Sequence, residues 1–195
     1  MAKIDQHKNI FGWFAYGDLY SHVVNKATDN SHFVEIGALL GKSSFFMAAS
    51  IEASKKNIKF DVIDTWKGSI EHQKGSDFEI AEVVNGTLYE TFLNNMKDVE
   101  DYYTPIRIPS VEASKLYDDQ SLDFVLIDGA HDYDSVLEDI SVWLPKVKPG
   151  GILAGDDYSL DHPEVVKAVN DYFNIKTHEP FERIRFNDKT WWVTI

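Results

Sequence analysis

Acidic side chains stand at four points of this sequence where an apolar, β-rich run ends. They are Glu35, Asp64, Asp128 and the pair Asp156 and Asp157. Neighbouring parallel strands end at one edge of a sheet, where ligands bind, so these carboxylates are expected to gather there. Three of them (Asp128, Asp156 and Asp157) would repel one another and raise one another's pKa unless a cation lay between them. All-oxygen ligation suits Mg²⁺, and the pattern predicts a divalent metal site. The alternative is that Asp128 orients a cofactor while the other two cap the next turn.

A glycine-bounded loop follows the first of these runs, with the sequence EIGALLGKS at positions 35–43. Glycine at both ends of the loop permits a tight turn and a close approach of a ligand to the backbone. Asp64 lies 23 residues after Gly41. That spacing suits a carboxylate that accepts hydrogen bonds from the ribose hydroxyls of a nucleoside. An ordinary turn with a solvated Asp64 is the alternative.

The spacing of the loop discriminates between nucleoside cofactors. A dinucleotide site uses G-x-G-x-x-G so that the backbone contacts the pyrophosphate. Here the pattern is G-x-x-x-G, with Leu39 and Leu40 inside the loop. S-adenosylmethionine has no phosphate and tolerates this bulk, and Glu35 can order the loop around a ligand that carries an ammonium group. The loop therefore favours S-adenosylmethionine over a nicotinamide dinucleotide.

Alternating strand and helix patterns predict the scaffold that positions these residues. Strands are expected at 33–36, 59–63, 105–108, 122–127 and 152–155, helices at 13–26, 43–53, 133–144 and 163–173, a turn at 148–151, and a terminal hairpin of 183–186 and 190–195 around a turn at 187–188. Residues 78–84 and 88–96 have helical potential. This order predicts an α/β, Rossmann-like fold: a mostly parallel sheet with one antiparallel strand from the hairpin and helices on both faces.

Composition limits the class of protein. The chain has 195 residues, 19 basic and 32 acidic side chains, a net charge of −13 and no cysteine. Cysteine chemistry is thereby excluded, and the acidity argues against a nucleic-acid partner. No apolar run approaches the ~18 residues of a membrane span. We expect one cytoplasmic domain over 1–195, with an N-terminal helical cap at 1–30 and a substrate-side insertion at 68–101.

The motifs together resemble the class I S-adenosylmethionine-dependent methyltransferases, in particular the small single-domain group related to macrolide-sugar O-methyltransferases and cephalosporin-biosynthesis-type enzymes. The matching stretches follow the family order at 33–44, 64–69, 127–133, 148–151 and 155–158, with Asp139 and Trp143 between them. The resemblance covers roughly residues 30–160. It implies a seven-stranded sheet whose last strand is antiparallel, in agreement with the predicted hairpin.

The resemblance also implies roles for individual residues. It places Glu35, Gly37, Gly41 and Ser43 around the methionine part of the cofactor, Asp64 at the ribose, Trp66 beside the adenine and Ser110 on the adenine side. It further supports a divalent ion at the three aspartates, where related enzymes hold a substrate hydroxyl near the methyl group.

A base for the acceptor is expected at His131, close to Asp128. His131 lies at the start of a predicted helix, whose positive end would depress the imidazole pKa. A neutral imidazole could then take the proton of a substrate hydroxyl. Some sugar O-methyltransferases carry an acid two residues after the metal-binding aspartate, and Ala130 stands there in this chain.

These residues predict a methyltransferase that uses S-adenosylmethionine, and possible Mg²⁺, to O-methylate a small hydroxylated molecule. The resemblance also implies a homodimer, which is common in the family. Two other functions remain open: a nicotinamide-dependent oxidoreductase, and a non-enzymatic binding protein that keeps the cofactor loop only as structure. Titration with each cofactor would separate them.

Overall fold

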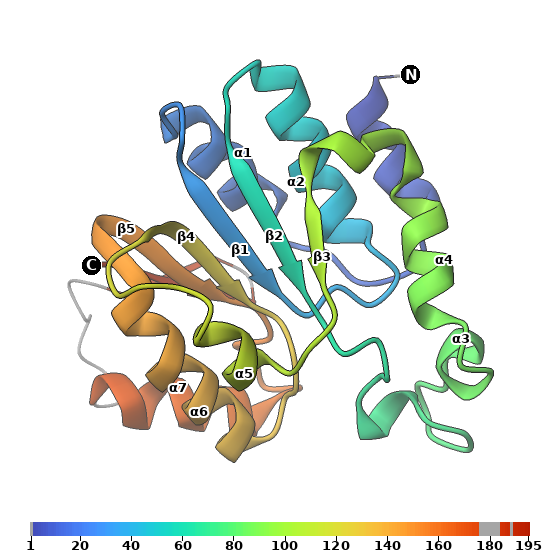
Figure 1. Ribbon diagram of the computed structural model, residues 1–195. Helices are drawn as coiled ribbons and strands as arrows, with labels where there is room; N and C mark the ends of the chain where they lie inside the picture. The colour runs from blue at the N-terminus through green and yellow to red at the C-terminus, as the bar shows by residue number, and fades with distance from the viewer. Residues whose placement is uncertain (1, 176–183, 188) are drawn as a thin grey trace.

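The computed structural model describes residues 2–175, 184–187 and 189–195. Seven strands of this part of the chain form one sheet, in the order β3-β2-β1-β4-β5-β7-β6 (Figure 1). The strands are β1 (His32–Ile36), β2 (Lys59–Ile63), β3 (Thr104–Ile106), β4 (Leu122–Ile127), β5 (Val147–Gly155), β6 (Ile184–Asn187) and β7 (Thr190–Thr194). Strands β1 to β5 pair in parallel, and β7 runs antiparallel to both β5 and β6. The predicted fold class is confirmed.

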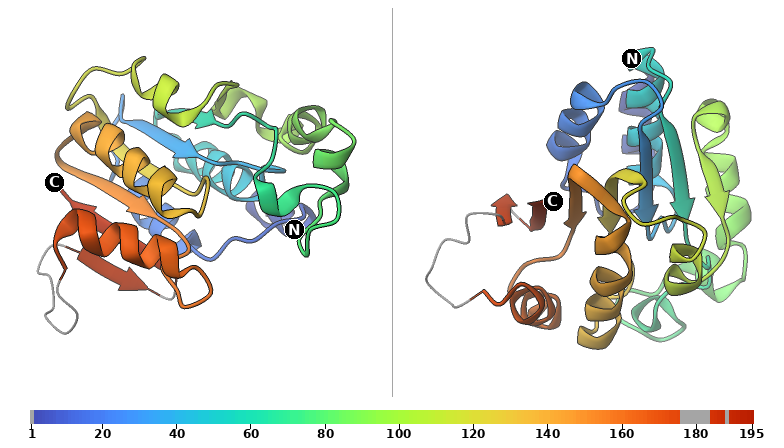
Figure 2. Two further views of the ribbon diagram at one scale, coloured as in Figure 1. Left: turned by 90° about the horizontal axis from the view of Figure 1, so that it is seen from below. Right: turned by 60° about the vertical axis from the view of Figure 1, so that its left-hand side comes forward.

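Helices cover both faces of the sheet (Figure 2). They are η1 (Lys3–Asn9), α1 (Gly17–Lys26), α2 (Lys42–Ser54), η2 (Ile70–His72), α3 (Ala81–Val84), α4 (Leu88–Asn95), η3 (Lys97–Tyr102), α5 (Ser110–Ser114), α6 (Tyr133–Trp143), η4 (Leu144–Lys146) and α7 (Pro163–Phe173). Alternation of side chains along the strands divides the core into two clusters. Phe33, Phe60 and Phe124 pack with α1, α2 and α4, whereas Val34, Val125 and Leu153 pack with α5, α6 and α7. None of the described helices is both long and apolar enough to span a membrane.

The first predicted helix begins later than expected, at Gly17 instead of Trp13. Residues 13–16 alternate instead, with Trp13 exposed, Phe14 half-buried and Tyr16 buried. An alternating pattern of this kind places every second side chain on one side of an extended chain. Lys42 holds the segment by donating a hydrogen bond from Nζ to the carbonyl oxygen of Gly12 over 2.8 Å. The spacing of the apolar residues alone did not distinguish this extended segment from a helical turn.

The predicted turn at 148–151 lies inside β5, at the point where the pairing of β5 with β4 shifts in register. Leu122 pairs with Val147 and Phe124 pairs with Ile152, so that the extra residues of β5 bulge out of register. Gly150 has a φ of +84°, a conformation that glycine adopts without strain. At the C-terminus β6 and β7 pair as the expected hairpin. Two residues of the predicted hairpin, Arg183 and Asp188, lie outside the described residues.

Candidate active site

Strand register brings the predicted acids to one edge of the sheet. Ile36 is paired with both Ile63 and Ile127, and Ile127 is paired with Gly155, so four strands end level with one another. The residues that follow these strand ends are Gly37, Asp64, Asp128 and Asp156. In Figure 1 β1 and β2 point to this lower edge, where the segment after β2 leads to η2 and α3. The acids that follow these strands therefore lie at one edge of the sheet, as the sequence predicts.

Gly37 opens the loop between β1 and α2 where the ends of β1 and β4 approach closely. Its φ is +89°, and a Cβ at this position would overlap the carbonyl oxygen of Asp128. The Gly37 N–H donates to the carbonyl oxygen of Ile63 over 2.9 Å. Gly41 closes the loop, with a φ of +91°, immediately before α2. Glycine at both positions gives the loop a shape that other residues would strain.

Glu35 lies beneath this loop and is fully buried. Ser43 and Ser44, in the first turn of α2, donate their hydroxyl protons to the two carboxylate oxygens, Ser44 over 2.7 Å. Burial raises the pKa of Glu35 to about 7, although both serine hydrogen bonds favour its charged form. Glu35 and Ser43 thus order the loop from below; direct contact of either with a cofactor remains a prediction.

Asp64 fastens the end of β2 to the same loop. Its Oδ2 accepts hydrogen bonds from the backbone N–H groups of Ala38 and Leu39 at 2.8 and 3.1 Å, and its Oδ1 accepts one from Trp66 N–H at 2.7 Å. A carboxylate has about four acceptor positions, so three N–H bonds leave one for a ribose hydroxyl. The ribose assignment stays a prediction, and the loop contacts give Asp64 a second role.

The structure does not support the adenine-side prediction for Trp66, and that for Ser110 stays a prediction. The Trp66 ring packs against the rings of Tyr89 and Phe92, each with its centroid 4.7 Å away, and only 4% of Trp66 is exposed. It is a core residue with no free face for an adenine. Ser110 donates to Asp139 Oδ1 over 2.5 Å and accepts a hydrogen bond from Trp143 Nε1 over 2.8 Å. The Ser110 hydroxyl therefore joins α5 to α6.

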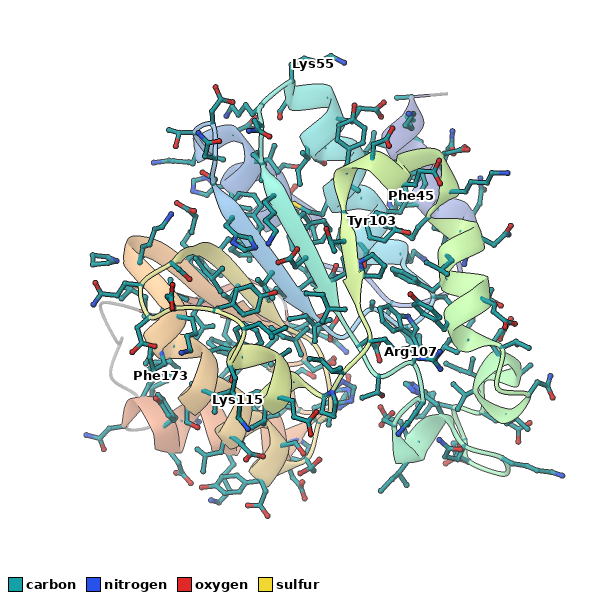
Figure 3. The ribbon with its side chains drawn as sticks, viewed as in Figure 1. Phe45, Lys55, Tyr103, Arg107, Lys115 and Phe173 are labelled. Atoms are coloured by element: carbon teal, nitrogen blue, oxygen red, sulfur yellow. The ribbon has the colours of Figure 1, made fainter. Side chains whose placement is uncertain are left out.

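Arg107, which the sequence analysis did not single out, lies just after β3 at the same edge of the sheet (Figure 3). Its guanidinium carbon stands 4.7 Å from the centroid of the Tyr89 ring, and its Nε donates to the carbonyl oxygen of Thr65 over 3.4 Å. A guanidinium over an aromatic face is attracted by the ring quadrupole, whose negative side is the face of the ring. This pair forms an exposed cationic border on the side where β2 and β3 end.

Asp128, Asp156 and Asp157 form an acidic triad, with one carboxylate oxygen of each within 4.8 Å of the others. Tyr16 donates its hydroxyl proton to Asp128 Oδ2 over 2.7 Å, and Thr190 donates to Asp156 Oδ1 over 3.1 Å. Burial and the neighbouring carboxylates raise the pKa of Asp128 well above its usual value and that of Asp156 to about 6. Ionisation of all three carboxyls is therefore unfavourable here, and a bound cation would favour it.

A small cavity adjoins the triad. Its volume is about 10 Å³, and Asp128, His131 and Asp156 contribute to its lining together with apolar residues of the α6 and α7 side. A volume of about 10–15 Å³ accommodates one water-sized sphere. The space fits a single ion or water and excludes an organic ligand.

His131 lies between the triad and the segment that follows β2. Its Nε2 stands 2.9 Å from Asp157 Oδ2, and its Nδ1 lies 3.0 Å from Glu71 Oε1 without the alignment of a hydrogen bond. Burial alone would lower the pKa of His131, but the hydrogen bond to Asp157 and the surrounding carboxylates raise it to about 9. The expected lowering of the His131 pKa is therefore wrong. Helix α6 begins at Tyr133, beyond His131, and the nearby carboxylates outweigh its dipole.

The N-terminal cap and the 68–101 insertion meet beside the site. The Trp13 ring is nearly parallel to the His72 ring, with centroids 6.3 Å apart, and meets the Phe78 ring edge-on at 6.1 Å. Glu71, next to His72, is the residue that reaches His131. This contact places the insertion beside the triad, and its role in substrate binding stays a prediction.

A larger cavity of about 410 Å³ opens between α1 and the β5–β7 face of the sheet. Tyr16 and Thr190 line it, and both also bind members of the acidic triad. Its other lining residues are Asp18, Leu19, His22, Ile152, Trp192 and Thr194. The cavity therefore approaches the acidic triad from the side of the sheet that α1 covers.

Comparison with known proteins agrees with this geometry. The sequence model of a family described as "Methyltransferase domain" matches residues 34–158. A curated relative, the uncharacterized protein y4gI of Sinorhizobium fredii, is 25% identical over 145 residues, which are 74% of this chain and 15% of the relative. The chain therefore spans only a small part of that protein.

Solved structures share the fold. The O-methyltransferase NovP superposes with a TM-score of 0.65 at 18% identity, over 91% of this chain and 78% of NovP. A putative O-methyltransferase from Klebsiella pneumoniae gives 0.61 at 16% identity, over 98% and 88% of the two chains. The O-methyltransferase from Bacillus cereus, solved in complex with SAH, gives 0.62 at 12% identity, over 100% and 91%.

Proposed function

This chain belongs to the family of methyltransferase domains, and from that premise we propose that it moves the methyl group of S-adenosylmethionine to a hydroxyl group of a small molecule, with help from a divalent ion. The family match confirms the resemblance drawn from the motifs. The observation that carries the proposal is the level ending of β1, β2, β4 and β5, which sets the glycine loop beside the acidic triad.

The loop and Asp64 fit the methyl donor. Leu39 and Leu40 occupy the middle of the loop, where a dinucleotide would require its pyrophosphate to approach the backbone. Asp64 keeps one acceptor position beside the loop, as a ribose hydroxyl requires. When bound, S-adenosylmethionine supplies an electrophilic methyl group on a sulfonium sulfur.

Asp128 lies between the loop and the other two acids. Its carbonyl oxygen packs against Gly37, and its carboxylate belongs to the triad. An acceptor hydroxyl held there faces the cofactor loop, which favours attack on the methyl carbon at ~3 Å, in line with the sulfur. We assign the removal of the hydroxyl proton to Asp128. With S-adenosylmethionine bound, the acceptor oxygen would form its bond to the methyl carbon as the carbon–sulfur bond breaks, with S-adenosylhomocysteine as the leaving group.

The acidic triad would hold the ion. Its oxygen donors and the mutual repulsion of its carboxylates suit a divalent cation, and the 10 Å³ cavity beside it has room for one. In this position the ion would polarise the acceptor hydroxyl, and Asp128, Asp156 and Asp157 would fix its place.

Calorimetric titration with S-adenosylhomocysteine and, separately, with NADH tests the proposal. We expect binding of S-adenosylhomocysteine at one site per chain and no heat from NADH. Release of S-adenosylhomocysteine from S-adenosylmethionine with a panel of hydroxylated acceptors would then identify the acceptor. If the folded protein bound neither nucleoside, it would be a non-enzymatic member of the family. Binding of NADH alone would support an oxidoreductase.

A further inference from the structure

A second group of possible ligands shares Asp157 with the acidic triad. His131 Nε2 lies 2.9 Å from Asp157 Oδ2, and His162 Nε2 lies 3.4 Å from Asp157 Oδ1. The three side chains offer ligand atoms that all lie within 4.8 Å of one another.

Three different elements bring these side chains together. His131 lies in the loop between β4 and α6, Asp157 follows β5 with a φ of +59°, and His162 directly precedes α7. The two imidazole rings meet at 64° with centroids 4.6 Å apart. All three side chains are partly buried, with 19% to 27% of each exposed. They are accessible to an ion from solvent and are held by the scaffold.

The distances match those of ligands around one ion. Metal–nitrogen and metal–oxygen bonds of about 2.1 Å separate adjacent ligand atoms by about 3.0 Å at right angles and by about 3.4 Å at a tetrahedral angle. The observed separations are 2.9 Å between His131 Nε2 and Asp157 Oδ2 and 3.4 Å between His162 Nε2 and Asp157 Oδ1. Small rotations of the side chains would admit an ion between them.

We infer that His131, Asp157 and His162 bind a divalent transition-metal ion, of the class of Mn²⁺, Co²⁺ or Zn²⁺, in preference to Mg²⁺. Imidazole nitrogen suits Co²⁺ and Zn²⁺, and Mn²⁺ accepts it beside carboxylate oxygen, whereas Mg²⁺ selects oxygen ligands and water. Asp128 and Asp156 offer carboxylate oxygens within 4.8 Å of Asp157 and can complete the coordination of the same ion. The inference deepens the proposed function, because it names the ion and gives His131 a role as a ligand in place of the base.

Pulsed EPR of bound Mn²⁺ tests the ligands directly, without any measurement of activity. Protein stripped with EDTA and loaded with one equivalent of Mn²⁺ should show nitrogen modulation from coordinated imidazole. The modulation should vanish in the His131→Gln, His162→Gln double variant and persist in His22→Gln, which alters an exposed histidine on α1. Bound Mn²⁺ without nitrogen modulation would overturn the inference and leave the ion to the carboxylates.

Calorimetry with Mn²⁺, Co²⁺ and Mg²⁺ tests the preference. We expect Mn²⁺ and Co²⁺ to bind at least tenfold more tightly than Mg²⁺, and His162→Gln to weaken both on the order of tenfold with little effect on Mg²⁺. Equal affinities, or unchanged Mn²⁺ affinity in His162→Gln, would contradict the inference. Binding of S-adenosylhomocysteine to each variant verifies its fold. If S-adenosylhomocysteine binds but no transition ion does, the methyl-donor assignment survives and the ion site fails.

Discussion

The carboxylate of Asp64 accepts a hydrogen bond from the backbone N–H of Ala38 over 2.8 Å, and this bond ties the end of β2 to the glycine loop after β1. A residue expected to serve the cofactor therefore also shapes the loop that receives it. Loss of the carboxylate should remove both contributions, and binding and stability measurements can separate them.

Asp64→Ala should weaken S-adenosylhomocysteine binding by roughly tenfold to a hundredfold, because charge-assisted hydrogen bonds contribute about 1.5–3 kcal/mol. The free energy of unfolding should also fall, by about 1–3 kcal/mol, since Ala38 and Leu39 lose the acceptor of their N–H groups. Calorimetry and urea titration measure the two effects. Asp134→Ala, on the exposed side of α6, serves as the control. Unchanged affinity with reduced stability would restrict Asp64 to a structural role.

Chelation should stop methyl transfer without releasing the cofactor. EDTA should abolish turnover and a divalent ion should restore it, because the triad requires a cation, whereas the loop and Asp64 do not. Asp156→Asn should reproduce the chelated state, since loss of one carboxylate charge weakens the site. Asp161→Asn removes a nearby exposed acid that pairs with Lys189 and should have no effect on turnover. Full turnover in EDTA would refute a requirement for the ion.

Asp139→Asn should make the protein more stable at neutral pH. Burial raises the pKa of Asp139 to about 6, above its usual value of 3.8. The folded state therefore binds this proton more tightly than the unfolded state, and wild-type stability should fall as pH rises from about 4 to about 6.

Above that range the ionised, buried carboxylate costs up to about 3 kcal/mol. Asparagine can still accept the hydrogen bond from Ser110 and carries no charge. Urea denaturation at pH 4 and pH 7.5 should show a gain for Asp139→Asn only at the higher pH. A gain of equal size at both values would indicate that ionisation is not its cause.

Gly37→Ala should destabilise the fold by more than about 4 kcal/mol or prevent folding, because the added Cβ overlaps the carbonyl oxygen of Asp128. Gly75→Ala is a matched control, with a φ of +84° and no heavy atom within 4 Å of the added Cβ. It should cost only about 1–2 kcal/mol, the strain of a left-handed conformation. Thermal melting of the two variants measures the difference. Similar losses in both would show that φ, and not the contact with Asp128, requires glycine at position 37.

The sequence by itself determined the scaffold and the edge of the sheet where the acids gather. Strands β2 and β4 and helix α7 begin and end where the apolar patterns predict. These patterns are local, since a strand or helix buries residues at a fixed period. Parallel strands end at one edge, so Asp64, Asp128 and Asp156 lie along the same edge of the sheet.

Only the tertiary structure decided which of these groups are free and which are already bound. Tyr16 donates to Asp128 across a separation of 112 residues, and His162 reaches Asp157 from the start of α7. The charge of His131 and the burial of Trp66 likewise depend on neighbours far along the chain. Such contacts arise from strand register and helix packing, which depend on the whole chain. The local spacing of apolar residues therefore does not predict them.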